Sequence, residues 1–325
     1  MSLTMDTTDT LGGKERNDHI LARIGYKRGE HRVTPGLYRV NGPDDKSPVL
    51  VTSNYSLSFD AVRSHLKGIA AWVLVLDTKG INVWCAAGKG TFGTDEIVRQ
   101  VKGTGLEEIV SHRRLILPQL GAPGVKAHEV KERTGFVVEY GPIRAEDIPA
   151  YLKDRKATPE MRQVQFPAKD RVVLVPVEWR NYLKLGIPAG LLLVVLAGWF
   201  GLGVFLLGYV GSLFFFPLLF PYLPSKKFSI KGMALGALLS LPLLAWSWLG
   251  PMPLVEMALV DLAVLLGMMG VVGYVGLNFT GSTPYASRTG VKDEIFRFIP
   301  PMVAMSATGL ALAVAAGIGI YAGWF

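Results

Sequence analysis

The C-terminal half of the chain is too apolar to fold as a water-soluble domain. Charged residues are frequent up to about residue 180, but few occur between residues 185 and 325, and the mean hydropathy of the whole chain is +0.33. A helix that crosses a bilayer needs roughly 20 residues, because it rises about 1.5 Å per residue. The pattern therefore predicts five transmembrane helices, at about 183–200, 203–222, 232–250, 254–275 and 299–322.

Positive charge in this half is confined to two of the predicted loops. The first loop holds Lys226, Lys227 and Lys231, and the second holds Arg288, Lys292 and Arg297. With five helices, both loops lie on the same side as the N-terminal region, and the positive-inside rule makes that side the cytoplasm. We expect a multi-pass protein of the cytoplasmic (inner) membrane with its C-terminus outside. The loops account for much of the net charge of +8, and no nucleic-acid-binding motif occurs, so we expect membrane lipid but no nucleic acid as a partner.

Two carboxylates, Glu256 and Asp261, fall within the fourth predicted helix. An ionisable group at the bilayer centre costs about 3 kcal/mol, so such a residue often marks a transport pathway. Glu256 follows Pro253 closely and is expected at the membrane interface, whereas Asp261 lies deeper. A structural partner for Asp261 within the helix bundle is the favoured interpretation, and a role in transport is the alternative.

The N-terminal half alternates short apolar runs, typical of strands, with helical stretches. Strands are expected at 47–52, 71–77, 114–117, 136–139 and 171–175, with helices between them. This alternation predicts an α/β domain, Rossmann-like with a mainly parallel sheet. The expected organisation is a flexible tail at 1–19 without the apolar core of a signal peptide, a cytoplasmic domain at 20–178 and a transmembrane domain at 179–325.

A glycine-rich segment follows the strand expected at 71–77. Gly88 to Gly93 fits the dinucleotide-binding pattern G-x-G-x-x-G, but that pattern should lie directly at a strand–helix turn, and ten residues separate Asp77 from Gly88. A P-loop is excluded because Lys89 is followed by Gly90 rather than by Ser or Thr. Neither phosphate-binding motif is therefore favoured.

The same segment contains Cys85, the only cysteine. A single cysteine excludes an intramolecular disulfide and an iron–sulfur or zinc site built on several cysteines of this chain. A cysteine nucleophile needs a base, and the histidines nearest in sequence, His65 and His112, are at least 20 residues away. The alternatives that remain are a buried free thiol and a single axial ligand to a metal that a macrocycle already holds.

Residues 82–89, Asn-Val-Trp-Cys-Ala-Ala-Gly-Lys, and the Gly-Thr-Phe-Gly-Thr that follows them resemble the signature of the HgcA family, the corrinoid proteins of microbial mercury methylation. The resemblance extends to the architecture, a corrinoid domain followed by five membrane helices. The soluble domain is also similar to the cobamide-binding domain of the corrinoid iron–sulfur protein of the acetyl-CoA pathway.

The resemblance implies a cobalamin-type corrinoid with the Cys85 thiolate as the lower axial ligand of cobalt, so that Cys85 is both metal ligand and catalytic residue. Its neighbours are expected to form the cap beneath the corrin: Asn82, Val83, Trp84, Ala86, Ala87, Gly88 and Lys89. Two loops at the carboxyl ends of strands are expected to touch the cofactor as well. They contribute Thr52, Asn54 and Ser58, and Gly121, Ala122 and Pro123.

The implied activity is that of a corrinoid-dependent methyltransferase, which moves the methyl group of methyl-cob(III)alamin to Hg(II) and so forms methylmercury. A thiolate beneath cobalt donates strongly and labilises the methyl group toward an electrophile. The implied partners are a ferredoxin-like dicluster protein of the HgcB type, as electron donor and mercury carrier, and a methyl donor protein or methyl-tetrahydrofolate. Two alternatives stay open: a corrinoid methyl carrier for a different acceptor, and a membrane sensor or transporter that binds a corrinoid without turnover.

Overall fold

The computed structural model describes residues 4–250 and 252–323. The chain divides into two compact units, Met1–Gln165 and Phe166–Phe325. The division falls ahead of the boundary expected at residue 178. The reason is that the residues after Gln165 are helical, and the first of these helices, α8 (Ala168–Val172), packs against a helix of the second unit.

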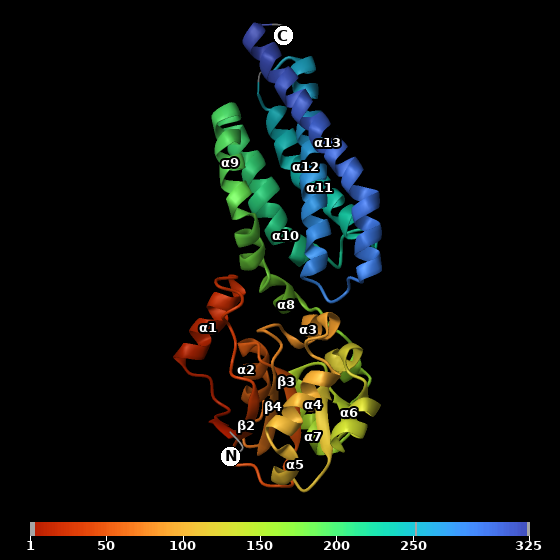
Figure 1. The fold of residues 1–325 in the computed structure, drawn as a ribbon. Coiled ribbons are helices and arrows are strands. Elements are labelled where there is room, and N and C mark those ends of the chain that lie inside the picture. The colour runs from red at the N-terminus through yellow and green to blue at the C-terminus, as the bar shows by residue number, and fades with distance from the viewer. Residues whose placement is uncertain (1–3, 251, 324–325) are drawn as a thin grey trace. The chain divides into compact units, whose positions relative to one another are not determined.

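The N-terminal unit has the predicted α/β fold, built on one mixed sheet of mostly parallel strands (Figure 1). The strands are β1 (Thr4–Thr7), β2 (Gly36–Val40), β3 (Val49–Ser53), β4 (Ala71–Leu76), β5 (Arg114–Pro118) and β6 (Val137–Gly141). Their order is β1-β2-β4-β3-β5-β6, and only the β2–β4 pair is antiparallel among these neighbours. Strands β3 to β6 occupy four of the runs expected from the sequence, because those runs are apolar enough to be buried on both faces.

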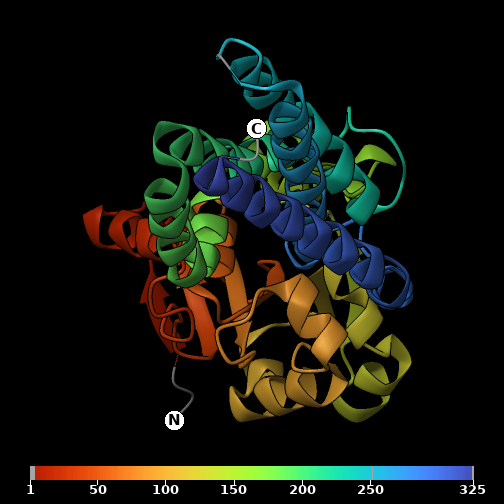
Figure 2. The same ribbon diagram turned by 90° about the horizontal axis from the view of Figure 1, so that it is seen from above.

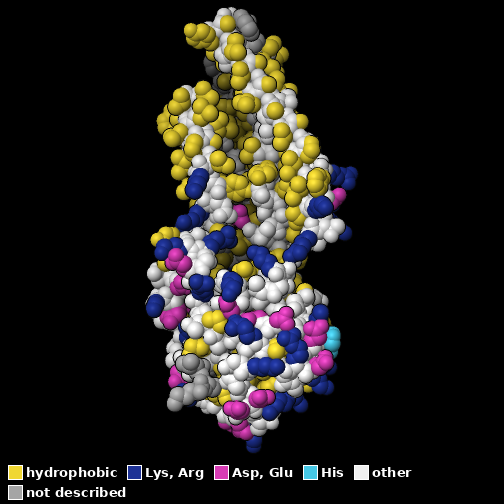
Figure 3. Space-filling model, in the orientation of Figure 1, with side chains coloured by type: hydrophobic (Ala, Val, Ile, Leu, Met, Phe, Trp, Pro, Cys, Tyr) yellow, Lys and Arg dark blue, Asp and Glu magenta, His cyan; other side chains and the backbone are white. Residues whose placement is uncertain are grey.

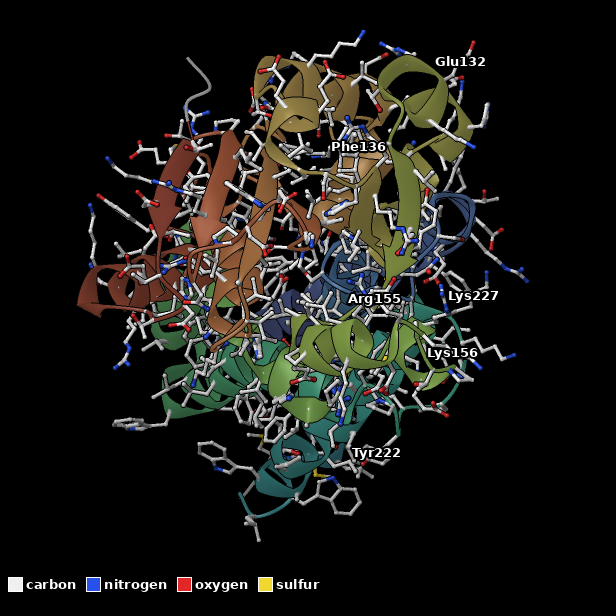
Figure 4. All side chains as sticks on the ribbon, turned by 90° about the horizontal axis from the view of Figure 1, so that it is seen from below. Glu132, Phe136, Arg155, Lys156, Tyr222 and Lys227 are labelled. Atoms are coloured by element: carbon white, nitrogen blue, oxygen red, sulfur yellow. The ribbon has the colours of Figure 1, made fainter. Side chains whose placement is uncertain are left out.

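Helices cover both faces of this sheet. One core packs Val49 and Val51 of β3 against α4 (Thr94–Gly103) and α6 (Ala127–Thr134). The other packs Leu50 against α2 (Ser56–Ser64) and α7 (Ile148–Asp154). Successive strand residues point to opposite faces, so β3 contributes to both cores. Phe136, at the end of α6, is fully buried in the first core, whereas Glu132 of α6 is exposed (Figure 4).

The path of the chain through the sheet creates a crevice. From β3 the chain passes to β4 on one side and then returns to β5 on the other side of β3. In open α/β sheets, ligands bind beyond the carboxyl ends of the strands at such a switch in direction. The fold therefore directs attention to the ends of β3 and β5.

The expectation of a flexible tail at 1–19 is wrong for residues 4–19. Strand β1 pairs in parallel with β2, and Asp6 accepts two hydrogen bonds of 2.7 Å from Arg39. Helix α1 (Gly13–Arg23) follows. Its sequence lacks an apolar stripe because polar side chains hold it in place, so a search for hydrophobic periodicity misses it.

Two polar clusters anchor α1. The His31 ring bonds to Asp18 through Nδ1 at 2.7 Å, and His19 contacts Asp60 at 2.8 Å. Asp60 is itself paired with the buried Arg63 at 2.6 Å. Burial lowers the pKa of His31, but its hydrogen bonds to Asp18 and to a backbone carbonyl outweigh that effect and raise the pKa above its ordinary value. The charged form of His31 is thus favoured in the folded domain.

The strand expected at 171–175 is also wrong. Residues 168–172 form α8, and α9 (Val175–Phe205) begins directly afterwards. The run of valines suggests a strand, but Pro176 lies in the first turn of α9, where its fixed φ suits a helix and its missing N–H costs nothing.

The C-terminal unit is helical, with hydrophobic side chains over much of its surface (Figure 3). Four helical segments in the described part of the chain are long and apolar enough to cross a membrane: Ala168–Leu219, Phe228–Ser247, Leu254–Gly281 and Arg288–Ala322. This count does not confirm the prediction of five. The last three segments contain α11 (Phe228–Ser247), α12 (Leu254–Asn278) and α13 (Arg288–Ala322).

The first of the four segments reverses direction. Ala197 and Gly198 have non-helical backbone angles, and the Tyr209 hydroxyl donates to the Trp179 carbonyl at 2.8 Å. A straight helix would separate those two residues by roughly 45 Å. Two limbs therefore lie side by side, the second continuing through η4 (Leu206–Gly211) into α10 (Ser212–Leu219) (Figures 1 and 2). Each limb has about the length that a bilayer requires, so five spans stay a prediction.

The two carboxylates that contact helix ends in this unit have structural partners. Asp261 accepts hydrogen bonds from the Ser247 hydroxyl at 2.6 Å and from the Trp248 ring nitrogen at 2.9 Å. Buried Glu294 accepts from the backbone N–H groups of Phe228 and Ser229 at the start of α11. The interpretation of Asp261 as a residue with a partner inside the bundle is confirmed.

We predict that residues 1–165 fold as an isolated domain and that residues 20–165 form a less stable one. Removal of 1–19 takes away Asp18 and His19 and leaves the buried His31 and Asp60 without those partners. Loss of one member of a buried pair costs about 3 kcal/mol. Urea denaturation of the two fragments measures the difference. Equal free energies of unfolding would show that the N-terminal segment is dispensable.

Candidate functional site

Cys85 lies in the first turn of a short helix, not in the glycine-rich loop that the sequence suggests. This helix, α3 (Val83–Lys89), begins because the Asn82 side chain accepts a hydrogen bond of 2.9 Å from the Cys85 backbone N–H. It ends at Gly90, whose φ of +82° is favourable only for glycine. Asn82 therefore fixes the backbone of Cys85, and Gly90 stops the helix.

The small residues of this region allow two protein segments to approach each other closely. Helix α3 packs on the 3-10 helix η1 (Gln119–Gly124). A Cβ atom on Gly124 would lie 2.2 Å from the Phe92 carbonyl oxygen and 3.0 Å from the Ala87 Cα, and one on Gly121 would lie 2.5 Å from the Phe92 ring. Ala86, Ala87 and Gly121 are buried. Their contact with a cofactor stays a prediction, because their small size already serves this packing.

A cavity of about 260 Å³ lies at the crevice beyond β3 and β5. It brings together five of the residues that the sequence suggests as cofactor contacts: Thr52, Ser58, Asn82, Val83 and Trp84. The rest of its wall is mostly apolar and comes from the ends of β3 and β5, from α2 and from α7. The first turn of α3 is thus part of the wall, with Cys85 directly following it in the chain.

The segment that follows β6 supplies a further part of the wall that sequence reasoning missed: Pro142, Ile143, Arg144 and Ala145. Arg144 is the only Lys or Arg among the lining residues, and its guanidinium contacts Glu146 and the Gln165 carbonyl, both at 3.4 Å. The rule that points to Thr52 also applies to the strand expected at 136–139, so the carboxyl end of that strand is the signal that could have found them.

Asn54 supports the site from beneath. Its side-chain oxygen accepts hydrogen bonds from the Thr78 and Gly80 backbone N–H groups, each at 3.0 Å, and from the Thr78 hydroxyl at 2.9 Å. These bonds hold the turn that leads from β4 into α3. Asn54 is not among the lining residues, and its oxygen is already occupied.

The remaining predicted residues lie outside this cavity. Gly88, Lys89 and Pro123 are exposed, and Ala122 is half-buried. The structure thus divides the predicted set into a cavity wall, a packing contact between α3 and η1, and an exposed group near them.

The Cys85 thiol is half-exposed and makes no disulfide. Burial raises its pKa, although Lys89, the Asn82 side chain and Arg28 act in the opposite direction. The neutral thiol is therefore favoured at neutral pH, and coordination to a metal would release a proton. Among the described residues, no three His, Cys, Asp or Glu side chains are grouped so that they could hold a metal ion. A metal at Cys85 would need most of its ligands from elsewhere, as the metal of a macrocycle has.

We predict that Asn82→Ala lowers the free energy of unfolding of residues 1–165 by about 1 kcal/mol, because it removes the helix cap. Asn82→Asp keeps a side-chain acceptor and should stay within a few tenths of a kcal/mol of the wild type. Urea denaturation followed by fluorescence, with Trp84 in α3 as a local probe, measures both. An unchanged stability of Asn82→Ala would show that the cap is not needed.

The N-terminal unit is similar to proteins of corrinoid metabolism. Residues 27–152 match the family described as CO dehydrogenase/acetyl-CoA synthase delta subunit. The corrinoid/iron–sulfur protein large subunit of Moorella thermoacetica is 28% identical over 153 residues, which are 44% of this chain and 34% of that protein. Gamma subunits of the acetyl-CoA decarbonylase/synthase complex are similar as well. The one from Methanopyrus kandleri is 34% identical over 39% of this chain, and the one from Methanothermobacter thermautotrophicus is 36% identical over 38%.

The matched region runs from the turn before β2 to α7 and contains both Cys85 and the cavity. The chain spans about a quarter of the length of the two gamma subunits, 27% of each. The similarity of the soluble domain to corrinoid proteins, expected from the sequence, is thereby confirmed for residues 27–152.

Proposed function

We propose that this chain is a membrane-anchored corrinoid protein that carries a methyl group on cobalt and transfers it to Hg(II), with the Cys85 thiolate as the lower ligand of the metal. The observation that carries the proposal is the position of Cys85. The only cysteine stands in the helical turn that walls a cavity at the strand-order switch, within a domain similar to corrinoid proteins.

The residues of the cavity fit an organic cofactor better than a bare ion. Its wall is mostly apolar, with the Thr52 and Ser58 hydroxyls and the Arg144 guanidinium as polar groups. Such a wall can bury a flat organic ring system while the hydroxyls and the guanidinium bond to its amide and phosphate oxygens. Cys85 then supplies the single soft donor that a macrocyclic metal lacks.

The chemistry divides between cofactor and protein. A bound corrinoid supplies the cobalt that holds the methyl group. Asn82 fixes the Cys85 backbone, and Val83 and Trp84 give the site an apolar wall that limits access of water. The Cys85 thiol must lose its proton to act as a ligand, and Lys89 and Arg28 favour the resulting thiolate. A thiolate is a stronger donor than water or imidazole, which suits transfer to an electrophile such as Hg(II).

Support for Hg(II) as the acceptor comes from residues 82–89, which match the mercury-methylation signature. The single cysteine also bears on the partner. Low-potential electrons would have to come from another protein, and we propose a ferredoxin-like dicluster protein that also delivers mercury. The methyl group would come from a methyl donor protein or from methyl-tetrahydrofolate.

We further propose that the C-terminal unit spans the cytoplasmic membrane with the soluble domain inside. The helical hairpin at Ala197 and Gly198, together with α11, α12 and α13, would provide five spans. The ends of α10 and α13 that carry Lys226, Lys227 and Lys292 would then face the cytoplasm, in keeping with the positive-inside rule.

We predict that Cys85→Ala abolishes formation of methylmercury by the full-length protein loaded with methylcorrinoid. The variant should stay folded, because a cysteine that is half-exposed removes little packing. Lys102→Gln, an exposed change on α4, serves as the matched control and should retain activity.

Methylmercury formation and corrinoid retention are measured together. Full activity of Cys85→Ala would rule out the ligand role. A wild type that retains methylcorrinoid but does not methylate Hg(II) would contradict the proposed acceptor and leave a methyl carrier for another acceptor.

Topology gives a separate prediction. Reporter fusions after Lys227 and after Lys292 should report a cytoplasmic location, and a fusion after Phe325 should report the opposite side. An odd number of spans is required for this result. If the fusion after Phe325 is cytoplasmic, the segment that reverses at Ala197 does not cross the membrane twice.

A further inference from the structure

The C-terminal unit contains a cavity of its own, of about 420 Å³. It lies where α10 ends and α11 begins, next to the segment between α12 and α13 (Figure 4, where Tyr222 and Lys227 mark the loop after α10). Its lining combines three cations with four aromatic rings: Arg171, Lys226 and Lys231, and Phe166, Phe220, Phe228 and Tyr285. The lining residues include no Asp or Glu.

Arg171 is buried in this wall without an acidic partner among the described residues. Only 6% of it is exposed. Its terminal nitrogens donate to the Phe166 carbonyl at 2.5 Å and to the Leu218 carbonyl at 3.4 Å. Its Nε is buried and has no hydrogen-bond partner. A buried donor without an acceptor is costly, so this nitrogen calls for an acceptor that the chain does not provide.

Lys231 is the second buried cation, with 7% exposed. Its ammonium group donates to the Phe220 carbonyl at 2.8 Å and to the Leu223 carbonyl at 2.6 Å, and it lies 4.9 Å from the centre of the Phe220 ring. An ammonium group has three N–H donors, so these two carbonyls leave one donor.

A purely structural role explains part of this arrangement. The carbonyls of Leu218 and Phe220 lie at the end of α10, where a helix leaves acceptors without partners, and cations commonly bind there. That role does not use the Arg171 Nε, and it leaves two buried positive charges without a counter-ion. The nearby acids are occupied, because Glu294 caps α11 and Asp293 pairs with Lys227 at 2.6 Å.

We propose that this cavity binds a phosphate group, carried either by the headgroup of an acidic phospholipid or by a soluble phosphate. Arg171 and Lys231 would donate from the buried wall, and exposed Lys226 would add a third positive charge. The aromatic wall would contact the organic part of the ligand. Phosphate oxygens suit this set, because charge-assisted hydrogen bonds from guanidinium and ammonium groups are stronger than bonds between neutral groups.

The test uses the full-length protein purified in detergent and native mass spectrometry with three probes: phosphatidylglycerol, phosphatidylcholine and inorganic phosphate. The variants are Lys226→Gln, which removes an exposed side chain, and Arg171→Gln, which removes the unpartnered donor. Lys292→Gln is the matched control, because it removes one exposed positive charge from the same end of the bundle but lies outside the cavity.

We expect phosphatidylglycerol to bind more tightly than phosphatidylcholine, and each cavity variant to weaken that binding about tenfold, while Lys292→Gln leaves it unchanged. Competition by inorganic phosphate at equal strength would support the site and assign it to a soluble phosphate, whereas no competition would assign it to lipid. Equal binding of the two lipids without phosphate binding would overturn the proposal. So would an equal effect of Lys226→Gln and Lys292→Gln, even if Arg171→Gln fails to fold.

Discussion

The place of β3 between β4 and β5 is the constraint on which the N-terminal site depends. Because the chain continues from β3 to β4 on one side and returns to β5 on the other, no crossover helix covers the crevice between the carboxyl ends of β3 and β5. The cavity lies at that crevice, and the turn after β4 brings α3 to its wall. Asn54 holds this turn and Asn82 caps α3, so two side-chain amides carry the geometry of the sheet to Cys85.

In the C-terminal unit, charged side chains serve helix ends. Lipid offers no hydrogen-bonding partners, so each free backbone group near the bilayer must be satisfied from within the protein. Glu294 satisfies N–H groups at the start of α11, and Lys231 satisfies carbonyls after α10. Arg171 acts in the same way but keeps one donor unused, which separates it from the others and makes the adjacent cavity a candidate for an anion.

Sequence patterns predicted the parts of the fold that depend on hydrophobic burial. The strand at 71–77 and the helix stop at Gly135 are examples, since an apolar run and a residue with positive φ leave direct signals. The patterns could not find α1, which polar pairs such as Asp18 with His31 hold in place. They also misread α3, because the Asn82 cap matters more than the glycine content around it. Within the candidate site, Thr52 and Trp84 were predicted, whereas Arg144 lies after a strand whose carboxyl end received no attention.

The most direct test of the Cys85 ligand is the electron paramagnetic resonance spectrum of a Co(II) corrinoid bound to the purified full-length protein. The wild type should show no superhyperfine splitting from a nitrogen ligand, and Cys85→His should show the splitting of one nitrogen. The visible spectrum of Cys85→Ala should differ from that of the wild type. Identical spectra for the wild type, Cys85→Ala and Cys85→His would contradict the assignment of Cys85 as the lower ligand of cobalt.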